Sequence, residues 1–181
     1  PTYRSSVVGE IRDDGFVNDL GLGMTISQLV QLDALFLKRG ISVELVLHPM
    51  SGATVPVELS AIRLSSFDRK VKSLYRFINS FDALITDYSS VSIDFLVTGK
   101  PLYIFAPDFE EYEKSRGFFD NFEILLGIQV SKDTTSLMFE LDKENYDFQR
   151  LEKALNNWHD YNRNDRSRKI WQHISKGSLT K

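Results

Sequence analysis

The 181-residue chain contains no cysteine, and this absence removes several kinds of chemistry together. Without thiols the protein has no disulfide, no zinc–thiolate site and no cysteine nucleophile. The chain also lacks an apolar run near the ~20 residues that span a bilayer, and its first residues do not follow the pattern of a signal peptide. We therefore expect chemistry based on hydroxyl, carboxylate, imidazole and guanidinium groups.

An excess of positive charge is also missing. The chain has 22 Lys and Arg residues against 25 Asp and Glu residues, which gives a formal net charge of -3. We expect no nucleic-acid partner, because such proteins carry clustered basic residues. The hydrophobic fraction of 42% is that of an ordinary globular protein, and the length suits one domain with a real core. The chain begins at Pro1 rather than Met, and we interpret it as a fragment of a longer protein.

Several well-known catalytic motifs are absent from the sequence. It contains no GxGxxG and no GxxxxGK[ST], which disfavours a dinucleotide site and a P-loop. It contains no GxSxG, so its serines do not form a hydrolase elbow. The three histidines have no spacing typical of metal ligands, and we expect neither a metal nor a cofactor.

What the sequence does contain is an alternation of strand and helix patterns. The strand patterns lie at 41–49, 61–64, 82–86 and 101–106, and the helix patterns at 25–40, 68–80, 89–99 and 108–117. This order predicts an α/β fold with a Rossmann-like parallel sheet and helices on both faces. We expect residues 1–133 to form this domain and residues 134–181 to form a helical segment that packs on it.

Two of the predicted helices have an assigned inner face. The first begins with a capping box of Thr25 and Gln28 and ends at Gly40. Its inner face is predicted to hold Ile26, Leu29, Val30 and Leu37, and that of the second helix to hold Val71, Leu74, Tyr75 and Ile78.

Polar residues follow the ends of the predicted strands. They are His48-Pro49, the turn Asp87-Tyr88-Ser89-Ser90, and Pro107-Asp108 leading to Arg116-Gly117, with Thr2-Tyr3-Arg4 as a fourth set if a strand precedes it. In parallel α/β sheets ligands bind outside the carboxyl ends of the strands. The sequence therefore predicts a binding site at this edge.

The pair Ser89 and Ser90 has two interpretations. At a helix N-terminus their hydroxyl and backbone N–H groups could hold a phosphate. Alternatively, one serine is an ordinary N-cap and the other its neighbour. Asp94, one helical turn beyond Ser90, could bind a ribose hydroxyl, fix the serine turn or simply face solvent.

The basic candidates also have two interpretations each. His48 could donate to a phosphate or act as an acid or base, or it could be a surface residue at a strand end. Arg116 could pair with a pyrophosphate or with one of the preceding glutamates. The same two interpretations, a phosphate contact or an ion pair within the protein, apply to Arg4. His159 and His173 lie among polar residues on predicted helices, and we expect both to be structural or surface residues.

Four stretches together resemble one known family. "LITDYSSVSIDF" followed by "GKPLYIFAPDFEEYEKSRGFF", with "LVLHPM" and "PTYR" upstream, is similar in order and spacing to the CDP-glycerol glycerophosphotransferases of teichoic-acid and capsule synthesis. The resemblance covers roughly residues 1 to 123. It implies the C-terminal, donor-binding half of a two-domain transferase of the GT-B type.

The resemblance also implies roles for individual residues. By analogy Ser89 and Ser90 hold the diphosphate of CDP-glycerol, and His48 and Arg116 contact phosphate, with His48 the catalytic candidate. Asp94 would bind ribose or support the turn. Arg4 and Asp87 complete the predicted substrate-binding set. A further histidine that serves as base is implied in the N-terminal half, so this fragment is expected to bind donor without turnover.

The implied partners are CDP-glycerol or a related CDP-polyol and a lipid-linked polymer acceptor that reaches the site through the N-terminal half. The full-length protein is then expected in the cytoplasm, peripheral on the inner face of the bacterial membrane. Two alternatives stay open at this point. One is a GT-B glycosyltransferase or epimerase half that binds a UDP-sugar, and the other is a flavodoxin-like binding or receiver module.

Overall fold

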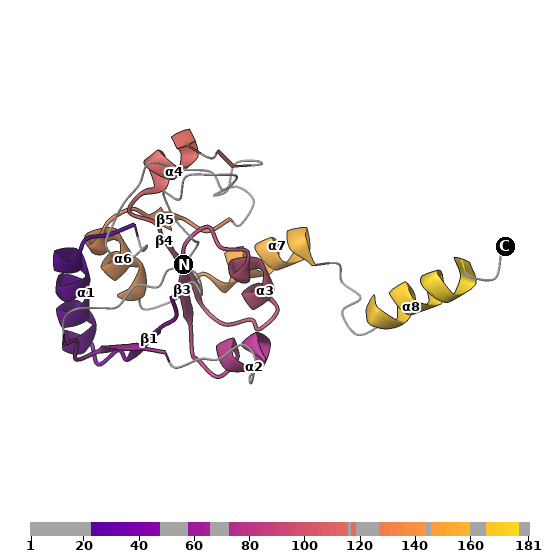
Figure 1. Cartoon of the computed structure of the whole chain (residues 1–181), viewed down its shortest axis with the longest axis horizontal. Coiled ribbons are helices and arrows are strands. Elements are labelled where there is room, and N and C mark those ends of the chain that lie inside the picture. Colours follow the sequence, from indigo (N-terminus) through magenta and orange to yellow (C-terminus); the bar gives the residue numbers. More distant parts are fainter. Residues whose placement is uncertain are drawn as a thin grey trace, which may run out of the picture.

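A computed structural model of the protein describes residues 23–47, 58–65, 73–115, 117–118, 127–143, 146–159 and 166–177. Within them strands and helices alternate along the chain (Figure 1). The strands are β1 (Val43–Leu45), β2 (Ile62–Leu64), β3 (Leu84–Thr86), β4 (Leu102–Phe105) and β5 (Val130–Ser131). The helices are α1 (Ile26–Lys38), α2 (Leu74–Ile78), α3 (Val91–Leu96), α4 (Phe109–Ser115), α6 (Thr134–Leu141), α7 (Phe148–Trp158) and α8 (Arg166–Gly177).

All pairs of the described strands are parallel. β1 pairs with β2, with Val43 opposite Ile62, and β3, β4 and β5 form a second sheet in that order. Parallel strands need helical crossovers between them, which is why strand and helix alternate in the sequence. The predicted α/β class is confirmed.

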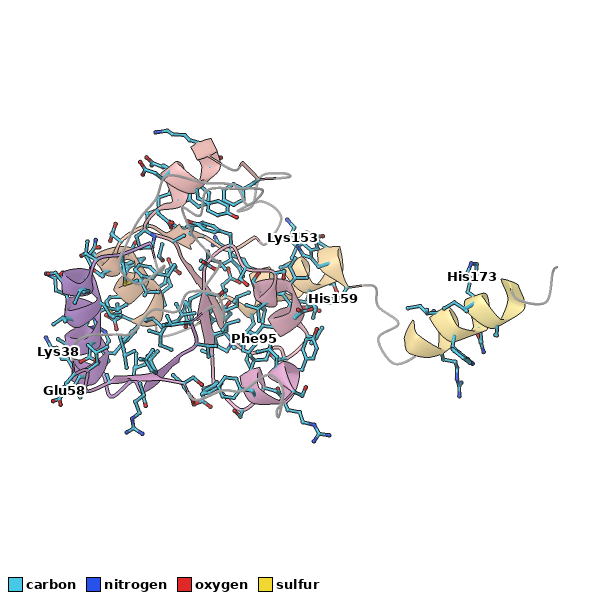
Figure 2. The ribbon with its side chains drawn as sticks, viewed as in Figure 1. Lys38, Glu58, Phe95, Lys153, His159 and His173 are labelled. Carbon is cyan, nitrogen blue, oxygen red and sulfur yellow. The ribbon has the colours of Figure 1, made fainter. Side chains whose placement is uncertain are left out.

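Helices cover both faces of the β3–β4–β5 sheet. Leu102 and Ile104 of β4 belong to a core with α3 and α7, whereas Phe105 belongs to a core with α1 and α6. Alternate residues of a strand point to opposite faces, so one strand supplies both cores. Figure 1 shows α1 and α6 on one side of the sheet and α3 and α7 on the other. Figure 2 shows Phe95, which is fully buried, in the core with α3 and α7.

Helix α1 begins and ends as its sequence predicts. Thr25 and Gln28 form the capping box. At the other end the N–H of Gly40 donates to the carbonyl of Leu37 and the N–H of Ile41 donates to that of Phe36, at 3.1 and 3.0 Å. This is a Schellman arrangement, and it requires the positive φ of 65° that Gly40 adopts.

The predicted inner face of α1 was partly wrong. Val30 and Leu37 are 43% and 57% exposed, and the buried residues are Leu29, Leu32, Asp33 and Phe36. These residues follow the spacing i, i+3, i+4, i+7, which is the true stripe of this helix. The apolar side chains of Val30 and Leu37 misled the sequence pattern because an acid, Asp33, occupies the centre of the buried face.

Three further expectations need correction or limits. Tyr75 was predicted to face inward, but it is 61% exposed, whereas Leu74 and Ile78 do contact the core. Val71 lies outside the described residues. The two-residue strand β5 was not predicted, because Val130 and Ser131 are too few to give a periodic pattern.

The C-terminal part contributes two helices to the body of the fold. Leu137 and Met138 of α6 pack in the core with α1, and Leu151, Ala154 and Leu155 of α7 pack in the core with α3. Helix α8 lies apart from the other elements in Figure 1. The proposed boundary near residue 134 stays a prediction. No helix in the described part of the chain is both long enough and apolar enough to cross a membrane.

Two contacts fix the helices on the α3 side. A ring nitrogen of His159, at the end of α7, lies 2.9 Å from the carbonyl oxygen of Ile93 in α3. The hydroxyl of Tyr146 accepts from the N–H of Leu102 at 3.0 Å and donates to its carbonyl at 2.9 Å. Figure 2 shows His159 beside α3 and His173 on the separate α8.

Candidate functional site

The carboxyl ends of β3 and β4 carry polar turns that meet. Asp87, Tyr88, Ser89 and Ser90 follow β3, and Asp108 follows β4. The hydroxyl of Tyr88 donates a hydrogen bond to Oδ1 of Asp108 across the two turns. Because the two strands are parallel and adjacent, their carboxyl ends lie at one edge of the sheet, as the sequence predicted.

The serine turn is held by its own neighbours. Oδ1 of Asp87, a buried carboxylate, accepts from the N–H of Ser89 at 3.1 Å. The hydroxyl of Ser92 donates to the carbonyl of Ser89 at 2.9 Å. These bonds fix the backbone without using the hydroxyl groups of Ser89 or Ser90.

Several donors of this turn have no acceptor among the described residues. Ser90 is the N-cap of α3, but its side chain makes no capping bond. The hydroxyls of Ser89 and Ser90 and the N–H groups of Ser90 and Val91 donate to no described group. Ser90 therefore occupies the N-cap position, but its hydroxyl does not cap the helix. Helix α3 is also shorter than the predicted 89–99, so local donors rather than a long helix dipole define this turn.

These donors line a cavity of about 430 Å³. Its polar end is formed by Thr86, Asp87, Ser89, Ser90 and Asp94. Asp94 and Ser90 therefore share one wall, as the one-turn spacing in the sequence predicted. The rest of the lining is mostly apolar and comes from α1, α2, β1 and β3.

An aromatic cluster packs around Tyr88, which belongs to the turn after β3. The ring of Tyr88 stacks on Tyr112 at 4.0 Å between centroids and lies 5.5 Å from Phe118, which in turn stacks on Phe109. Such contacts add to the stability that burial provides, and they fix the position of the Tyr88 ring. The Tyr88–Asp108 bond therefore lies beside a cluster of packed aromatic rings.

Glycine at position 23 makes room for Asp108. Gly23 has a φ of +70°, and a Cβ atom there would lie 2.6 Å from Cγ of Asp108. Both the conformation and the space exclude a side chain. Gly23 is therefore packed directly against the carboxylate that Tyr88 contacts.

The structure brings together four of the predicted site residues, Asp87, Ser89, Ser90 and Asp94. The other three, Arg4, His48 and Arg116, lie outside the described residues. Leu47, which precedes His48, lines the same cavity. The roles of all seven residues stay predictions.

Sequence reasoning missed two polar groups with structural roles. One is the pairing of Tyr88 with Asp108, for which the sequence gives no signal. The other is Asp33, whose carboxylate accepts from the N–H groups of Ser60, Ala61 and Ile62 at 2.9, 2.8 and 2.8 Å. An acid in the middle of an apolar helical stripe was the available signal, because buried carboxylates are almost always paired.

Asp33 is charged in the folded protein. Burial acts to raise the pKa of its carboxyl group, but the three backbone N–H donors outweigh burial and hold the pKa below its ordinary value. Asp33 joins α1 to the start of β2 and does not line the cavity.

Comparison with known proteins finds one family and its members. The profile of the CDP-glycerol:poly(glycerophosphate) glycerophosphotransferase family matches residues 1–176. The chain is 34% identical over 116 residues to a teichoic acid ribitol-phosphate primase of Bacillus spizizenii, covering 64% of this chain and 29% of that protein. It is 26% identical over 149 residues to the teichoic acid glycerol-phosphate primase of Bacillus subtilis, covering 82% and 36%.

The fold has counterparts among solved structures. A structure of the wall teichoic acid polymerase TagF superposes with a TM-score of 0.62 at 24% identity, covering 92% of this chain and 41% of that chain. A second TagF structure gives a TM-score of 0.59 at 25% identity, covering 92% and 42%. The chain thus spans about a third of the length of the curated relatives it matches. The match over residues 1–176 establishes that this chain belongs to the CDP-glycerol:poly(glycerophosphate) glycerophosphotransferase family.

Proposed function

We propose that this chain is the donor-binding part of a polyol-phosphate transferase. In this proposal it binds CDP-glycerol or a related CDP-polyol, and the complete enzyme transfers the polyol phosphate to a teichoic-acid or capsular polymer. Family membership supports the reaction class. The observation that carries the site is the group of unused donors at Ser89, Ser90 and Val91, which lines the cavity at the carboxyl edge of the sheet.

The chemistry of these donors suits a diphosphate. Phosphate oxygens only accept hydrogen bonds, and this turn offers hydroxyl and N–H donors that have no acceptor in the part of the chain that the structure describes. Donors fixed before the ligand arrives lose little entropy on binding. The relatives are named as ribitol-phosphate and glycerol-phosphate primases of teichoic acid, and a TagF structure was obtained after a soak with CDPG.

The two acids take different parts in this proposal. Asp87 already accepts from the Ser89 N–H, so its proposed part is to hold the turn in place rather than to contact the donor. Asp94 is a carboxylate on the cavity wall, which would repel phosphate but accept from a hydroxyl. We assign Asp94 to a ribose or polyol hydroxyl.

The basic residues are carried over by resemblance alone. Arg4 and Arg116 are proposed to pair with phosphate oxygens, since guanidinium groups offer a fork of donors. His48, which follows the cavity-lining Leu47, is proposed to contact phosphate as the catalytic residue of this half.

The proposed reaction is an in-line displacement. An acceptor hydroxyl oxygen forms a bond to the β-phosphorus of the donor, the bond from that phosphorus to the bridging oxygen breaks, and CMP leaves. A base supplied by the other half of the enzyme takes the hydroxyl proton. The part described here would position the diphosphate and stabilise the charge that develops on the leaving group.

The UDP-sugar alternative is not favoured, because the family and its relatives are named for polyol-phosphate transfer. Calorimetric titration with CDP-glycerol, CDP-ribitol, CDP, CMP and UDP tests the choice. We expect the CDP species to bind best and CMP, which lacks the second phosphate, to bind more weakly. Stronger binding of UDP than of CDP would overturn the proposed donor.

The same proposal includes peripheral membrane association of the full-length protein. Helix α8 contains Arg166, Arg168, Lys169 and Lys176 and no acid, while the chain as a whole has a net charge of -3. Ile170 and Trp171 on this helix are 61% and 70% exposed. Basic helices with exposed Trp and Ile bind anionic membrane surfaces through charge and apolar area together.

Vesicle sedimentation tests this part separately from nucleotide binding. We expect the protein to pellet with phosphatidylglycerol vesicles and not with phosphatidylcholine vesicles, and Trp171→Ala to weaken pelleting about tenfold. Tyr75→Ala, at another exposed aromatic residue, is the matched control. Equal pelleting of Trp171→Ala and the parent protein would exclude α8 as the contact.

A further inference from the structure

Tyr88 belongs to the turn of the candidate site, but its side chain is directed away from the cavity. The described residues that line the cavity include both of its neighbours, Asp87 and Ser89, but neither Tyr88 nor Asp108. The hydroxyl of Tyr88 donates instead to Oδ1 of Asp108, in the turn after β4. Any part that Tyr88 takes in binding therefore acts through the backbone that it shares with its neighbours.

Apolar side chains would suit the surroundings of the Tyr88–Asp108 pair. Asp108 is 5% exposed, and the rings of Phe109, Tyr112 and Phe118 lie 4.0 to 6.2 Å from that of Tyr88 between centroids. Burial of a carboxylate costs free energy, and apolar residues of similar volume often stabilise a fold as well or better. A phenylalanine at position 88 would pack in the same cluster. The pair is therefore better explained by the geometry that it fixes than by stability.

Asp108 joins three segments that are distant in sequence. Its Cγ atom lies 2.6 Å from the point that a Cβ atom of Gly23 would occupy, so the residues just before α1 pack against it. Its carbonyl accepts from the N–H of Tyr112 in α4 at 2.9 Å. Its carboxylate accepts from Tyr88, which Ser89 directly follows. The start of α1, the turn after β3 and the start of α4 thus meet at one residue.

Two of these segments carry cavity-lining residues next to their contact with Asp108. Met24, directly after Gly23, lines the cavity, and so does Ser89, directly after Tyr88. Because each lining residue follows its contact residue in the chain, a shift of the Asp108 carboxylate would move both of them. The Tyr88–Asp108 bond therefore sets how these two parts of the cavity wall lie relative to each other.

We propose that Tyr88 and Asp108 are a positioning pair for the donor site. Their bond holds the serine turn where the hydroxyls of Ser89 and Ser90 meet the diphosphate, and neither member of the pair contacts the donor. This inference rests on the proposed function, because it takes a CDP-polyol as the ligand. Misplacement of binding groups weakens most the part of a ligand that those groups hold. The pair should therefore matter more for a diphosphate than for a monophosphate.

Calorimetric titration of the full-length protein with CDP-glycerol and with CMP tests the pair. Tyr88→Phe removes the hydroxyl and keeps the ring in its cluster. We expect its affinity for CDP-glycerol to fall about 10-fold, and that for CMP, which has one phosphate, to fall less than about 3-fold. The ratio of the two affinities is the decisive measurement, since partial unfolding would lower both by the same factor. Tyr75→Phe, at a residue 61% exposed, is the matched control and should leave both affinities unchanged.

A double variant separates position from stability. Tyr88→Phe takes one hydrogen-bond donor from the buried Asp108 carboxylate, which should lower the denaturation midpoint. Addition of Asp108→Asn removes that buried charge, so the midpoint should return toward that of the parent while the affinity ratio stays reduced. Asp108→Asn alone keeps an oxygen that can accept from Tyr88, and it should keep most of the ratio.

The outcomes distinguish this inference from the proposed function. An affinity ratio in Tyr88→Phe equal to that of the parent would overturn the inference alone. Recovery of both the midpoint and the ratio in the double variant would show that the pair serves stability only, and it would overturn the inference as well. A parent protein that does not bind CDP-glycerol would overturn the proposed function, and this inference would fall with it.

Discussion

The backbone N–H groups of two turns in this protein are bonded differently. In the turn that leads into β2, the carboxylate of Asp33 accepts from the N–H groups of Ser60, Ala61 and Ile62. Where β3 meets α3, the N–H groups of Ser90 and Val91 have no acceptor among the described residues. The first turn is completed by the protein itself. The second offers N–H donors that no described residue accepts from.

The difference is also visible in where the two turns lie. Asp33 is buried, and three backbone N–H donors of the described residues compensate its charge. Ser90 is exposed and Ser89 half-buried at the wall of a cavity. Mutations at the two turns should therefore separate stability from binding.

The largest effect on stability is expected for Asp33→Asn. The variant keeps the shape but loses the charged acceptor of three N–H groups, and we expect the free energy of unfolding to fall by about 2–4 kcal/mol. Urea denaturation measures this change. Asp82→Asn, at an exposed aspartate, is the control and should shift the unfolding free energy by less than about 0.5 kcal/mol. A similarly small change for Asp33→Asn would show that the three bonds are not needed.

The opposite pattern is expected for the double variant Ser89→Ala, Ser90→Ala. Its hydroxyls make no bonds within the described protein, so unfolding free energy should stay within about 0.5 kcal/mol of the parent. Affinity for CDP-glycerol should fall about 10- to 100-fold, because two donors to a charged group are lost. Ser80→Ala, which removes a hydroxyl from an exposed turn, is the matched control for calorimetry. Unchanged affinity together with lowered stability would reverse the roles of the two turns.

A smaller loss of stability is expected for Tyr146→Phe. The change removes the hydroxyl that bonds both the N–H and the carbonyl of Leu102 at the start of β4, and about 1–2 kcal/mol of unfolding free energy should be lost. Tyr75→Phe, at a residue 61% exposed, provides a comparison with no such bonds and should be neutral. Equal denaturation midpoints for the two variants would contradict this role of Tyr146.

The smallest effect concerns pH. The pKa of Asp33 in the folded protein lies below 3.8, its ordinary value, so the stability that its ionised form contributes is complete above about pH 4. That contribution is lost as the pH falls through the folded pKa. The stability difference between the parent and Asp33→Asn should therefore shrink as the pH is lowered below about 4. A difference that is constant over this range would mean that the charge of Asp33 contributes nothing.

The sequence predicted local structure well where one pattern dominated. Thr25 with Gln28, and Gly40 at the other end, fixed α1 to within a residue or two. The sequence was less informative about which helix faces are buried, as the exposed side chains of Val30, Leu37 and Tyr75 show. Helical spacing identifies the inner face only when apolar residues are confined to it, and here exposed positions are apolar while a buried one is Asp33.

The candidate site shows the same division. The order of "DYSS" after an apolar strand predicted that Asp87, Ser89, Ser90 and Asp94 would gather at one sheet edge, and they line one cavity. The sequence could not decide between a cap and a ligand site for the serines. The cap interpretation requires a side-chain capping bond, and the structure shows none for Ser90.

By itself, then, the sequence determined the α/β class, the parallel arrangement and the family resemblance, because periodicity and short motifs are local properties of a chain. Only the tertiary structure paired Tyr88 with Asp108, placed Asp33 under the first residues of β2, and placed β1 and β3 along one cavity. Each of these depends on segments that are distant in sequence and adjacent in space. Such contacts are set by how strands and helices pack, which no single stretch of the sequence specifies.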